Sequence, residues 1–219
     1  MERIPEPEIM DEAEQVRAYA EANFEEPHSQ IIANIRKFLP AEKIKGSALD
    51  LGCGPGDIVL RLLKAFPEIN LTAIDGSKNM LLYAENAARR ERLSERVRFV
   101  QALIPHLSLD RTFYDFIFSN SLLHHLHNPN VLWETIKRYS RKGTQLFIGD
   151  LIRPESTGAA RKIVETYSAN EPEVLRQDFY NSLLAAFTLE EVKDQLRETK
   201  LSLTTQTTSD RHMVVFGEI

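Results

Sequence analysis

The sequence predicts an α/β fold built on a mostly parallel β-sheet. Along the middle of the 219-residue chain, short apolar runs alternate with stretches of helical periodicity, which is typical of β-α units whose strands run in one direction. Three alternate glycines, Gly52, Gly54 and Gly56, separate the first of these runs from a helix. Near the C-terminus, Leu201–Thr207 and Met213–Glu218 alternate between polar and apolar residues across a short connection. This pattern indicates an antiparallel hairpin at the sheet edge.

Composition limits the class of protein. The length fits one domain of moderate size, and the 42% hydrophobic and 27% charged residues are ordinary for a globular chain. The single cysteine, Cys53, cannot form an internal disulfide. The first thirty residues hold nine acidic and two basic residues, the opposite of a targeting peptide, and no run approaches the roughly 18 apolar residues of a membrane span. We therefore expect a cytoplasmic protein without a membrane partner.

The elements of the core follow in chain order. Five strands are expected, and Asp57 and Ser77 stand where the N-caps of the next helices belong. Gly143, which follows a basic turn, marks the end of the helix before the fifth strand. The expected strands are Ser47–Leu51, Leu71–Asp75, Val97–Gln101, Phe113–Ser119 and Gln145–Asp150, and the helices between them are Ile58–Phe66, Lys78–Arg92 and Pro129–Ser140.

Both ends of the chain depart from this alternation. Residues 8–39 and 155–188 have helical periodicity without intervening strands, and each stretch is interrupted at a proline. The expected helices at the N-terminal end are Ile9–Phe24 and Ser29–Phe38, with a break at Glu26-Pro27; the helices of residues 155–188 break near Glu171-Pro172, and a last helix spans Leu189–Thr199.

The glycine run predicts a ligand site. Glycine lets the backbone turn tightly and approach a ligand without a Cβ in the way, and the following helix offers unpaired N–H groups at its N-terminus. Twenty-three residues after Gly52, the second strand ends in Asp75. A carboxylate there is well placed to accept hydrogen bonds from a ribose diol. The alternative is a tight strand–helix turn that binds nothing.

The spacing of the glycines discriminates between nucleotides. The dinucleotide motif G-x-G-x-x-G would place its third glycine at position 57, where this chain has Asp57. A carboxylate would oppose a pyrophosphate there, so a nicotinamide oxidoreductase is the weakest of the alternatives. The spacing is instead D-x-G-x-G-x-G, beginning at Asp50, and this resembles the class I methyltransferases, which bind S-adenosylmethionine. Further shared features are Asp75, Met80, Ser119-Asn120, the Leu-Leu-His-His-Leu run, and Lys142-Gly143 before the fifth strand.

The resemblance implies a fold and a cofactor site. It implies a seven-stranded, mostly parallel Rossmann-like sheet with helices on both faces and a closing hairpin. Residues 1–45 would form an N-terminal helical cap, and residues 46–219 the core, with a helical insertion at about 155–188 covering the substrate. In the class, an Asp after the third strand often receives the adenine amino group, and Ala102 and Leu103 stand there instead. The cofactor-binding residues implied are Asp50, Gly52, Gly54, Gly56, Asp75, Gly76, Met80, Ala102, Leu103 and Asn120.

The substrate is expected beyond the fourth and fifth strands, because ligands of open α/β sheets bind outside the carboxyl ends of the strands. His125, Asn120 and Asp150 are the catalytic candidates. A core and capping role for the histidines is the main alternative. A zinc site of His124, His125 and His127 is a further alternative, but adjacent histidines point in different directions and no cysteine or carboxylate joins them in the sequence, so we expect no metal. The candidates for the substrate-covering surface are Tyr19, Phe24, His28, Arg153, Tyr180 and Asn181, and packing or an ion pair is the alternative for each.

These features predict an S-adenosylmethionine-dependent methyltransferase that methylates an O, N or S atom of a small molecule by in-line displacement. The net charge of −5 is a poor match for a surface that follows a phosphate backbone, so no nucleic-acid partner is expected. An RNA-modifying methyltransferase and a non-catalytic S-adenosylmethionine-binding module remain as alternatives. The state of assembly is expected to be a monomer or a homodimer.

Overall fold

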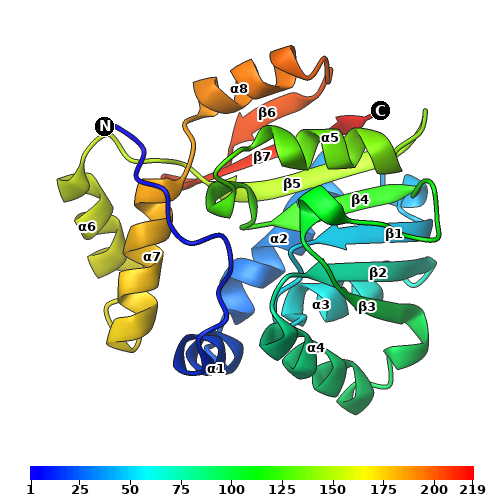
Figure 1. The fold of residues 1–219 in the computed structure, drawn as a ribbon, viewed down its shortest axis with the longest axis horizontal. Helices are drawn as coiled ribbons and strands as arrows, with labels where there is room; N and C mark the ends of the chain where they lie inside the picture. Colours follow the sequence, from blue (N-terminus) through cyan, green and yellow to red (C-terminus); the bar gives the residue numbers. More distant parts are fainter.

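Seven strands form one sheet in the order β3-β2-β1-β4-β5-β7-β6 (Figure 1). The computed structural model describes residues 1–219 except the side chain of Pro105. The strands from β3 to β5 are parallel to one another, and β7 is antiparallel to both β5 and β6. The strands are β1 (Gly46–Leu51), β2 (Ile69–Asp75), β3 (Val97–Gln101), β4 (Phe116–Asn120), β5 (Gln145–Leu151), β6 (Thr204–Thr207) and β7 (His212–Glu218).

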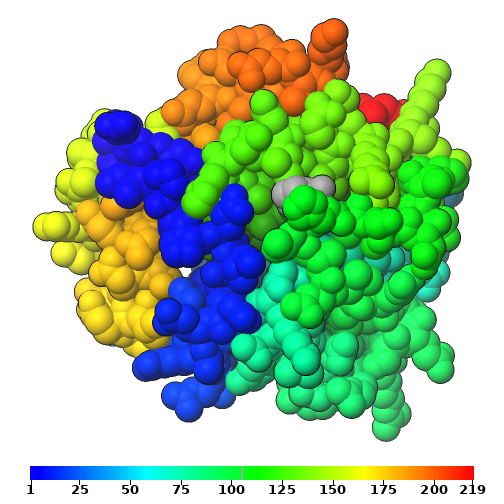
Figure 2. All heavy atoms as spheres, viewed as in Figure 1, coloured from blue at the N-terminus to red at the C-terminus, as the bar shows by residue number. Residues whose placement is uncertain are grey.

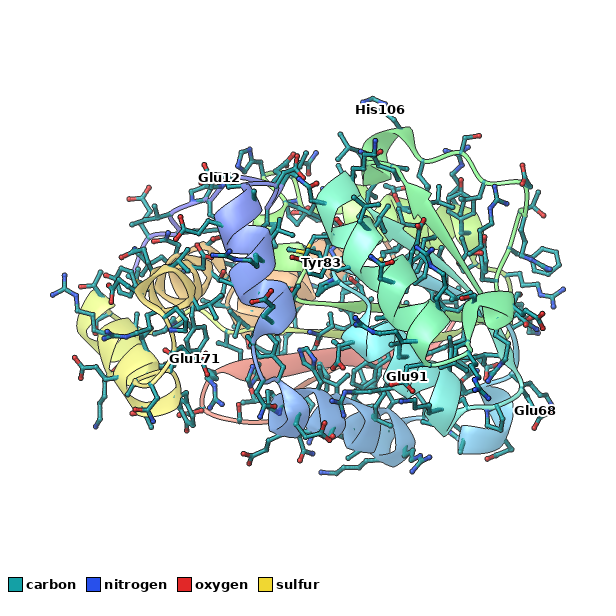
Figure 3. The ribbon with its side chains drawn as sticks, turned by 90° about the horizontal axis from the view of Figure 1, so that it is seen from below. Glu12, Glu68, Tyr83, Glu91, His106 and Glu171 are labelled. Carbon is teal, nitrogen blue, oxygen red and sulfur yellow. The ribbon has the colours of Figure 1, made fainter. Side chains whose placement is uncertain are left out.

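Eight α-helices surround the sheet. Within the described part of the chain, none of them has the length and apolar character that crossing a membrane requires. Seen from below, α1 lies between α4 and α7 (Figure 3). The helices are α1 (Ala13–Glu21), α2 (Glu25–Phe38), α3 (Asp57–Ala65), α4 (Lys78–Arg90), α5 (Asn130–Tyr139), α6 (Thr157–Tyr167), α7 (Glu173–Ala185) and α8 (Leu189–Glu198), with short 3-10 helices at η1 (Ala41–Lys43), η2 (Ser94–Arg96), η3 (Ile104–His106) and η4 (Leu123–His125).

Alternation along the strands supplies a separate core on each face of the sheet. Leu49 of β1 packs in one buried cluster with Trp133 of α5 and with residues of α8. Phe118 of β4 packs in the other with Ile35 of α2 and with residues of α3. Because neighbouring side chains of a strand point to opposite faces, each buried strand contributes to both clusters. The expected α/β architecture, including the closing hairpin, is confirmed.

Two local expectations about helix starts were wrong. Pro27 does not break the N-terminal helices; it lies in the first turn of α2, and the chain breaks before it, between α1 and α2. Proline is tolerated in a first turn because its missing N–H has no partner there anyway. Asp57 is the first residue of α3 and not its N-cap; Gly56 occupies that position in a left-handed conformation. Ser77 is the N-cap of α4 and accepts the Met80 amide, as expected.

The first twelve residues form an extended segment, which we call the N-terminal strap. Figure 2 shows it in blue, running between α7 and the segment that follows β4. The Ile4 amide donates to the Leu184 carbonyl (3.0 Å) at the end of α7. Farther along, the Asp11 carboxylate accepts the Ser77 hydroxyl (2.6 Å) at the start of α4. The strap therefore connects the helical insertion to the glycine-loop side of the sheet.

Candidate functional site

A cavity of about 1330 Å³ opens at the carboxyl ends of the central strands. It lies beside the switch point between β1 and β4, where the strand order reverses and where open α/β sheets bind ligands. The strap, α1, α2, α7 and the loop of the closing hairpin complete its wall. Of the predicted site residues, the cavity is lined by Gly52, Gly54, Asp75, Gly76, Met80, Ala102, Leu103, Asn120, His125, Asp150, Tyr19, Phe24 and His28.

The glycine loop turns sharply between β1 and α3. Its three glycines have φ angles of +78°, +54° and +86°, a left-handed region that side chains disfavour. A Cβ on Gly54 would meet nothing within 4 Å, whereas a Cβ on Gly56 would lie 2.8 Å from the Ala84 Cβ of α4. Gly54 therefore keeps the loop open towards the cavity, and Gly56 permits close packing of α3 against α4.

Asp75 is bound to the glycine loop. Its carboxylate accepts the Gly54 amide (2.7 Å) and the Ser77 amide (2.8 Å). Burial raises the pKa of Asp75, and the two amides offset only part of that rise. Asp50 lies beneath the loop and outside the cavity wall; burial, and then the neighbouring Asp75, raise its pKa well above the usual range.

The glycine loop, Asp75 and the residues after β3 line one half of the cavity, which we call the cofactor half. The far end of the cofactor half is apolar. Met80 is buried, while Leu103 is 46% exposed and lies against Gly76. A Cβ on Gly76 would come within 2.9 Å of the Leu103 side chain and 3.7 Å of Ile9 in the strap. The side-chain amide of Gln101, which lies outside the cavity wall, donates to the Gly76 carbonyl (3.2 Å). A flat aromatic ligand would therefore meet apolar surface here.

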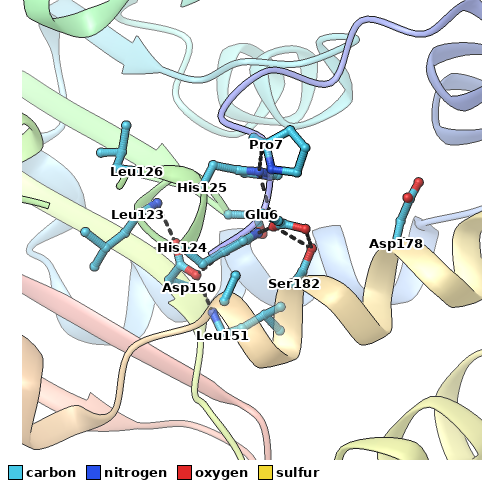
Figure 4. A network of polar contacts seen from close by, with 12 residues as sticks. Glu6, Pro7, Leu123, His124, His125, Leu126, Asp150, Leu151, Asp178 and Ser182 are labelled. Carbon is cyan, nitrogen blue, oxygen red and sulfur yellow. Dashed lines mark hydrogen bonds and ion pairs between the residues drawn. The ribbon is translucent and has the colours of Figure 1, made fainter. Parts of the chain in front are cut away.

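A buried polar network lies at the carboxyl ends of β4 and β5, at the opposite end of the cavity from Leu103 (Figure 4). Asp150 accepts the Leu123 amide (2.8 Å) and is 2.5 Å from the Nδ1 atom of His124. The opposite nitrogen of His124, Nε2, is 3.5 Å from Glu6 Oε1, and Glu6 also accepts the Ser182 hydroxyl (3.0 Å). The network thus joins the strap, the segment after β4, the end of β5 and α7.

The pKa values of the ionisable side chains in this network shift in different directions. Burial raises the pKa of Asp150, but His124 outweighs it and holds that pKa below its usual range. Burial lowers the pKa of His124, and the charge of Asp150 reverses the shift so that it is raised. For His125, burial and the neighbouring His124 lower the pKa to about 3. His125 is therefore neutral near pH 7 and accepts protons poorly, so a base role for it lacks electrostatic support.

The sequence argument that no carboxylate joins the histidines was wrong. Glu6 approaches both histidines, at 3.2 Å from His125 Nδ1 and 3.5 Å from His124 Nε2, and Asp150 contacts His124. These contacts join residues that are far apart in the chain, so the local run of histidines did not reveal them. His127 lies at the surface near the strap instead.

The predicted substrate-covering residues separate into two groups. Tyr19, Phe24 and His28 line the cavity as neighbouring rings, with centroids 4.9 and 5.0 Å apart. Burial raises the pKa of Tyr19 to about 12. His28 also contacts the Asp57 carboxylate (2.7 Å), which fastens α2 to α3.

Arg153, Tyr180 and Asn181 lie outside the cavity wall, which corrects their assignment. Arg153 is buried in an ion pair with Glu191 (2.6 Å) and also donates to the Ala186 carbonyl. On α7 the cavity is lined instead by Leu175, Asp178, Phe179 and Ser182. Positions three or four apart share one helix face, so Tyr180 and Asn181 fall on the sides of that face.

The middle of the chain is similar to known proteins. A family model for a methyltransferase domain matches residues 48–143, which include the glycine loop, Asp75 and both histidines. The match assigns residues 48–143, less than half of the chain, to a methyltransferase domain. A malonyl-[acyl-carrier protein] O-methyltransferase of Paenibacillus sp. (strain JDR-2) is 31% identical over 100 residues, 45% of this chain and 36% of that protein. The (S)-coclaurine N-methyltransferase of Thalictrum flavum subsp. glaucum is 29% identical over 119 residues, 53% of this chain and 32% of that protein. The matches span about a third of these relatives.

Solved methyltransferase structures share the fold. The plantazolicin methyltransferase BpumL, in complex with a desmethylPZN analogue and SAH, superposes with a TM-score of 0.62 at 18% identity and covers 93% of this chain and 96% of its own. A Haemonchus contortus phosphoethanolamine N-methyltransferase in complex with S-adenosyl-L-methionine gives 0.64 at 18% identity and covers 82% of this chain and 38% of its own.

The site has functional candidates that sequence reasoning missed. Glu6 reaches the histidines from the strap, and Asp178 and Ser182 reach the cavity from α7. One signal for the strap was available: Pro5 and Pro7 alternate with glutamates, and proline favours an extended backbone for itself and its predecessor. The α7 residues had no comparable local signal.

Proposed function

We propose that the protein is an S-adenosylmethionine-dependent methyltransferase that acts on a small molecule. The observation that carries the proposal is Asp75, a carboxylate in the cavity wall that is fixed by the amides of an open glycine loop. A ribose diol would find its acceptor there, and Gly54 leaves the space beside it free of side chains. When bound, S-adenosylmethionine supplies an electrophilic methyl group on a sulfonium.

The residues that line the cavity fit S-adenosylmethionine bound in one orientation. Met80, Ala102 and Leu103 would hold the adenine by apolar contact, at the far end of the cavity. Asn120, at the end of β4, lies between the cofactor half of the cavity and the polar network, and its side-chain amide donates to Ser121 (2.9 Å). We place the reacting methyl group beside Asn120 on this ground. The protein's main task would be to align the acceptor with it and to exclude water.

The half of the cavity beyond Asn120, which we call the acceptor half, has a wall that favours a small substrate. Tyr19, Phe24 and Phe179 supply aromatic surface, and Asp178 has one oxygen bound to Gln15 (2.9 Å). The other carboxylate oxygen of Asp178 is buried and has no hydrogen-bond partner within the described structure. The strap closes this side. The acceptor atom stays open between O, N and S, because the relatives named above include both O- and N-methyltransferases.

The rival substrate is RNA. The cavity wall carries the carboxylates of Glu8, Glu25, Glu26, Glu171 and Asp178 against the guanidinium of Arg211. A phosphate backbone would be repelled by such a rim. RNA binding that weakens steeply with added salt would contradict our preference for a small molecule.

Calorimetric titration with S-adenosylmethionine, S-adenosylhomocysteine and NAD tests the proposal. We expect dissociation constants on the order of micromolar for the first two and no heat of binding from NAD. Binding of NAD alone would replace the proposal with a nicotinamide enzyme. Failure of all three to bind would contradict it.

Gly149→Ala is expected to impair this site without unfolding the protein. An added Cβ would lie 2.7 Å from Asn120 Oδ1, and the amide can relieve the overlap only by leaving its position. We expect S-adenosylmethionine affinity to fall by about 3- to 10-fold, equivalent to losing roughly one hydrogen bond, as measured by calorimetry. The matched control is Gly158→Ala, whose Cβ would meet only Ser156 Oγ at 3.8 Å. Equal affinity of both variants would show that Asn120 does not contact the cofactor.

A further inference from the structure

Three ligand-type atoms converge beside the cavity. They are His124 Nε2, His125 Nδ1 and Glu6 Oε1, all within 4.8 Å of one another. His124 and His125 come from η4, and Glu6 comes from the strap, which crosses above them (Figure 4). His124 is 2% exposed, and the side chain of Glu6 is 10% exposed. The convergence is therefore part of the interior, where a charged group requires a partner.

We propose that Glu6, His124 and His125 bind a divalent transition metal ion, with Zn²⁺ as the best fit. Zinc bonds nitrogen and oxygen ligands at roughly 2.0–2.2 Å in tetrahedral geometry, which places two ligands of one ion about 3.3–3.6 Å apart. Glu6 Oε1 lies 3.5 Å from His124 Nε2 and 3.2 Å from His125 Nδ1. The 3.5 Å separation is long for an N–H···O hydrogen bond and matches the edge of a metal site.

The surrounding groups orient two of the three ligands as a metal requires, whereas His125 Nδ1 also faces the Pro7 carbonyl (3.4 Å) and must turn its lone pair to the ion. A histidine ligand ordinarily donates its second ring N–H to a carboxylate, which fixes the tautomer. Asp150 lies 2.5 Å from His124 Nδ1 and leaves the lone pair of Nε2 towards Glu6. The Ser182 hydroxyl donates to Glu6 (3.0 Å) and holds that carboxylate in turn.

Two further groups bear on the charge of the site. Arg3 donates to the carbonyls of His124 and Leu126 (2.8 and 3.0 Å), so its guanidinium opposes a cation. Glu6 and Asp150 supply two negative charges that offset a divalent ion. A proton on His124 is the competing occupant of the same position, and the experiment below distinguishes the two.

The position of the ion gives it access to the cavity. His124, His125 and Ser182 line the cavity, and three protein ligands leave a fourth position for water or substrate, as in catalytic zinc sites. An acceptor hydroxyl bound there would have its pKa lowered. Its proton would leave to water, its oxygen would bond the methyl carbon, and the C–S bond would break to give S-adenosylhomocysteine. This use rests on the proposed function, whereas metal binding itself does not.

Titration of the tag-free, full-length protein with Co²⁺ after chelator treatment tests the site. Co²⁺ reports its coordination through visible absorption, and Zn²⁺ should displace it. We expect one ion per chain, and Glu6→Gln and His125→Asn should each weaken binding by at least about tenfold. The matched control is His106→Asn, an exposed histidine of η3 whose loss should leave the affinity within twofold.

The outcomes separate this proposal from the proposed function. Absence of binding, or equal affinity in wild type, Glu6→Gln and His125→Asn, would overturn the metal site and favour a protonated His124 bridging the two carboxylates. Circular dichroism and thermal melting of each variant verify folding, and Glu6→Gln retains an acceptor for Ser182. S-adenosylmethionine titration of the same metal-free samples reports on the proposed function alone.

Discussion

Replacing Asp75 with alanine should weaken binding of S-adenosylmethionine by about 1.5–3 kcal/mol, the range for hydrogen bonds to a charged group. The change corresponds to a loss of affinity of roughly 10- to 150-fold. Alanine removes the acceptor that the ribose hydroxyls would use and also frees the Gly54 and Ser77 amides that the carboxylate now holds. Both effects act in the same direction, because the loop amides must stay aligned for the cofactor to bind. Calorimetric titration measures the loss directly.

Two further variants separate these contributions. Asp75→Asn keeps one oxygen for the loop amides and should fall between wild type and the alanine variant. Asp110→Ala removes an exposed carboxylate that pairs with Arg98 at the surface and should change the affinity by less than about twofold. An Asp75→Ala protein that melts cooperatively and binds with wild-type affinity would remove Asp75 from the cofactor site.

The sequence was sufficient for the sheet because its evidence is local. Alternating strands and helices were expected within a few residues of their observed bounds, and the hairpin after residue 200 was expected from its short connection. The start of β4 was misplaced: the strand begins at Phe116 and not at Phe113. Phe113 and Tyr114 are apolar, but Asp115 separates them from the strand and the sheet pairing begins at Phe116. Apolar character alone does not define where pairing starts.

The evidence for the cofactor half of the site was likewise local in the sequence. Gly52, Gly54 and Asp75 follow from the end of one strand and the end of its neighbour, and parallel strands bring those ends together. Contacts between the ends of neighbouring strands can be predicted from the strand order alone. Ala102 and Leu103 at the cavity wall follow for the same reason, from the end of β3.

The acceptor half could not be predicted from the sequence because its contacts are long-range. Glu6 meets His124 across more than a hundred residues, and no periodicity records such a pairing. On α7, the side facing the cavity depends on the helix rotation, which shifted the lining positions to Asp178 and Ser182. Arg153 was expected beside substrate or in an ion pair, and the structure supplies the pairing partner, Glu191, from α8.

Asp150→Ala should destabilise the fold by about 3–5 kcal/mol, the range for breaking a buried ion pair by removing one partner. Asp150 is 4% exposed, and its carboxylate accepts the amides of Leu123 and Leu151 as well as pairing with His124. Alanine would leave two buried amides and an imidazole without their acceptor, and each such group costs energy when desolvated. The free energy of unfolding, from urea denaturation, measures the effect.

Two variants test whether the loss arises from this buried pairing. Asp150→Asn retains one oxygen for the amides but not the charge opposite His124, so we expect an intermediate loss. Asp194→Ala removes a surface carboxylate paired with Arg197 on α8 and should change the stability by less than about 0.5 kcal/mol. Because Asp150 connects β5 to the segment after β4, its loss should also loosen the strap through His124 and Glu6. A loss below about 1 kcal/mol in Asp150→Ala would mean that other contacts hold the strap and the histidine segment in place.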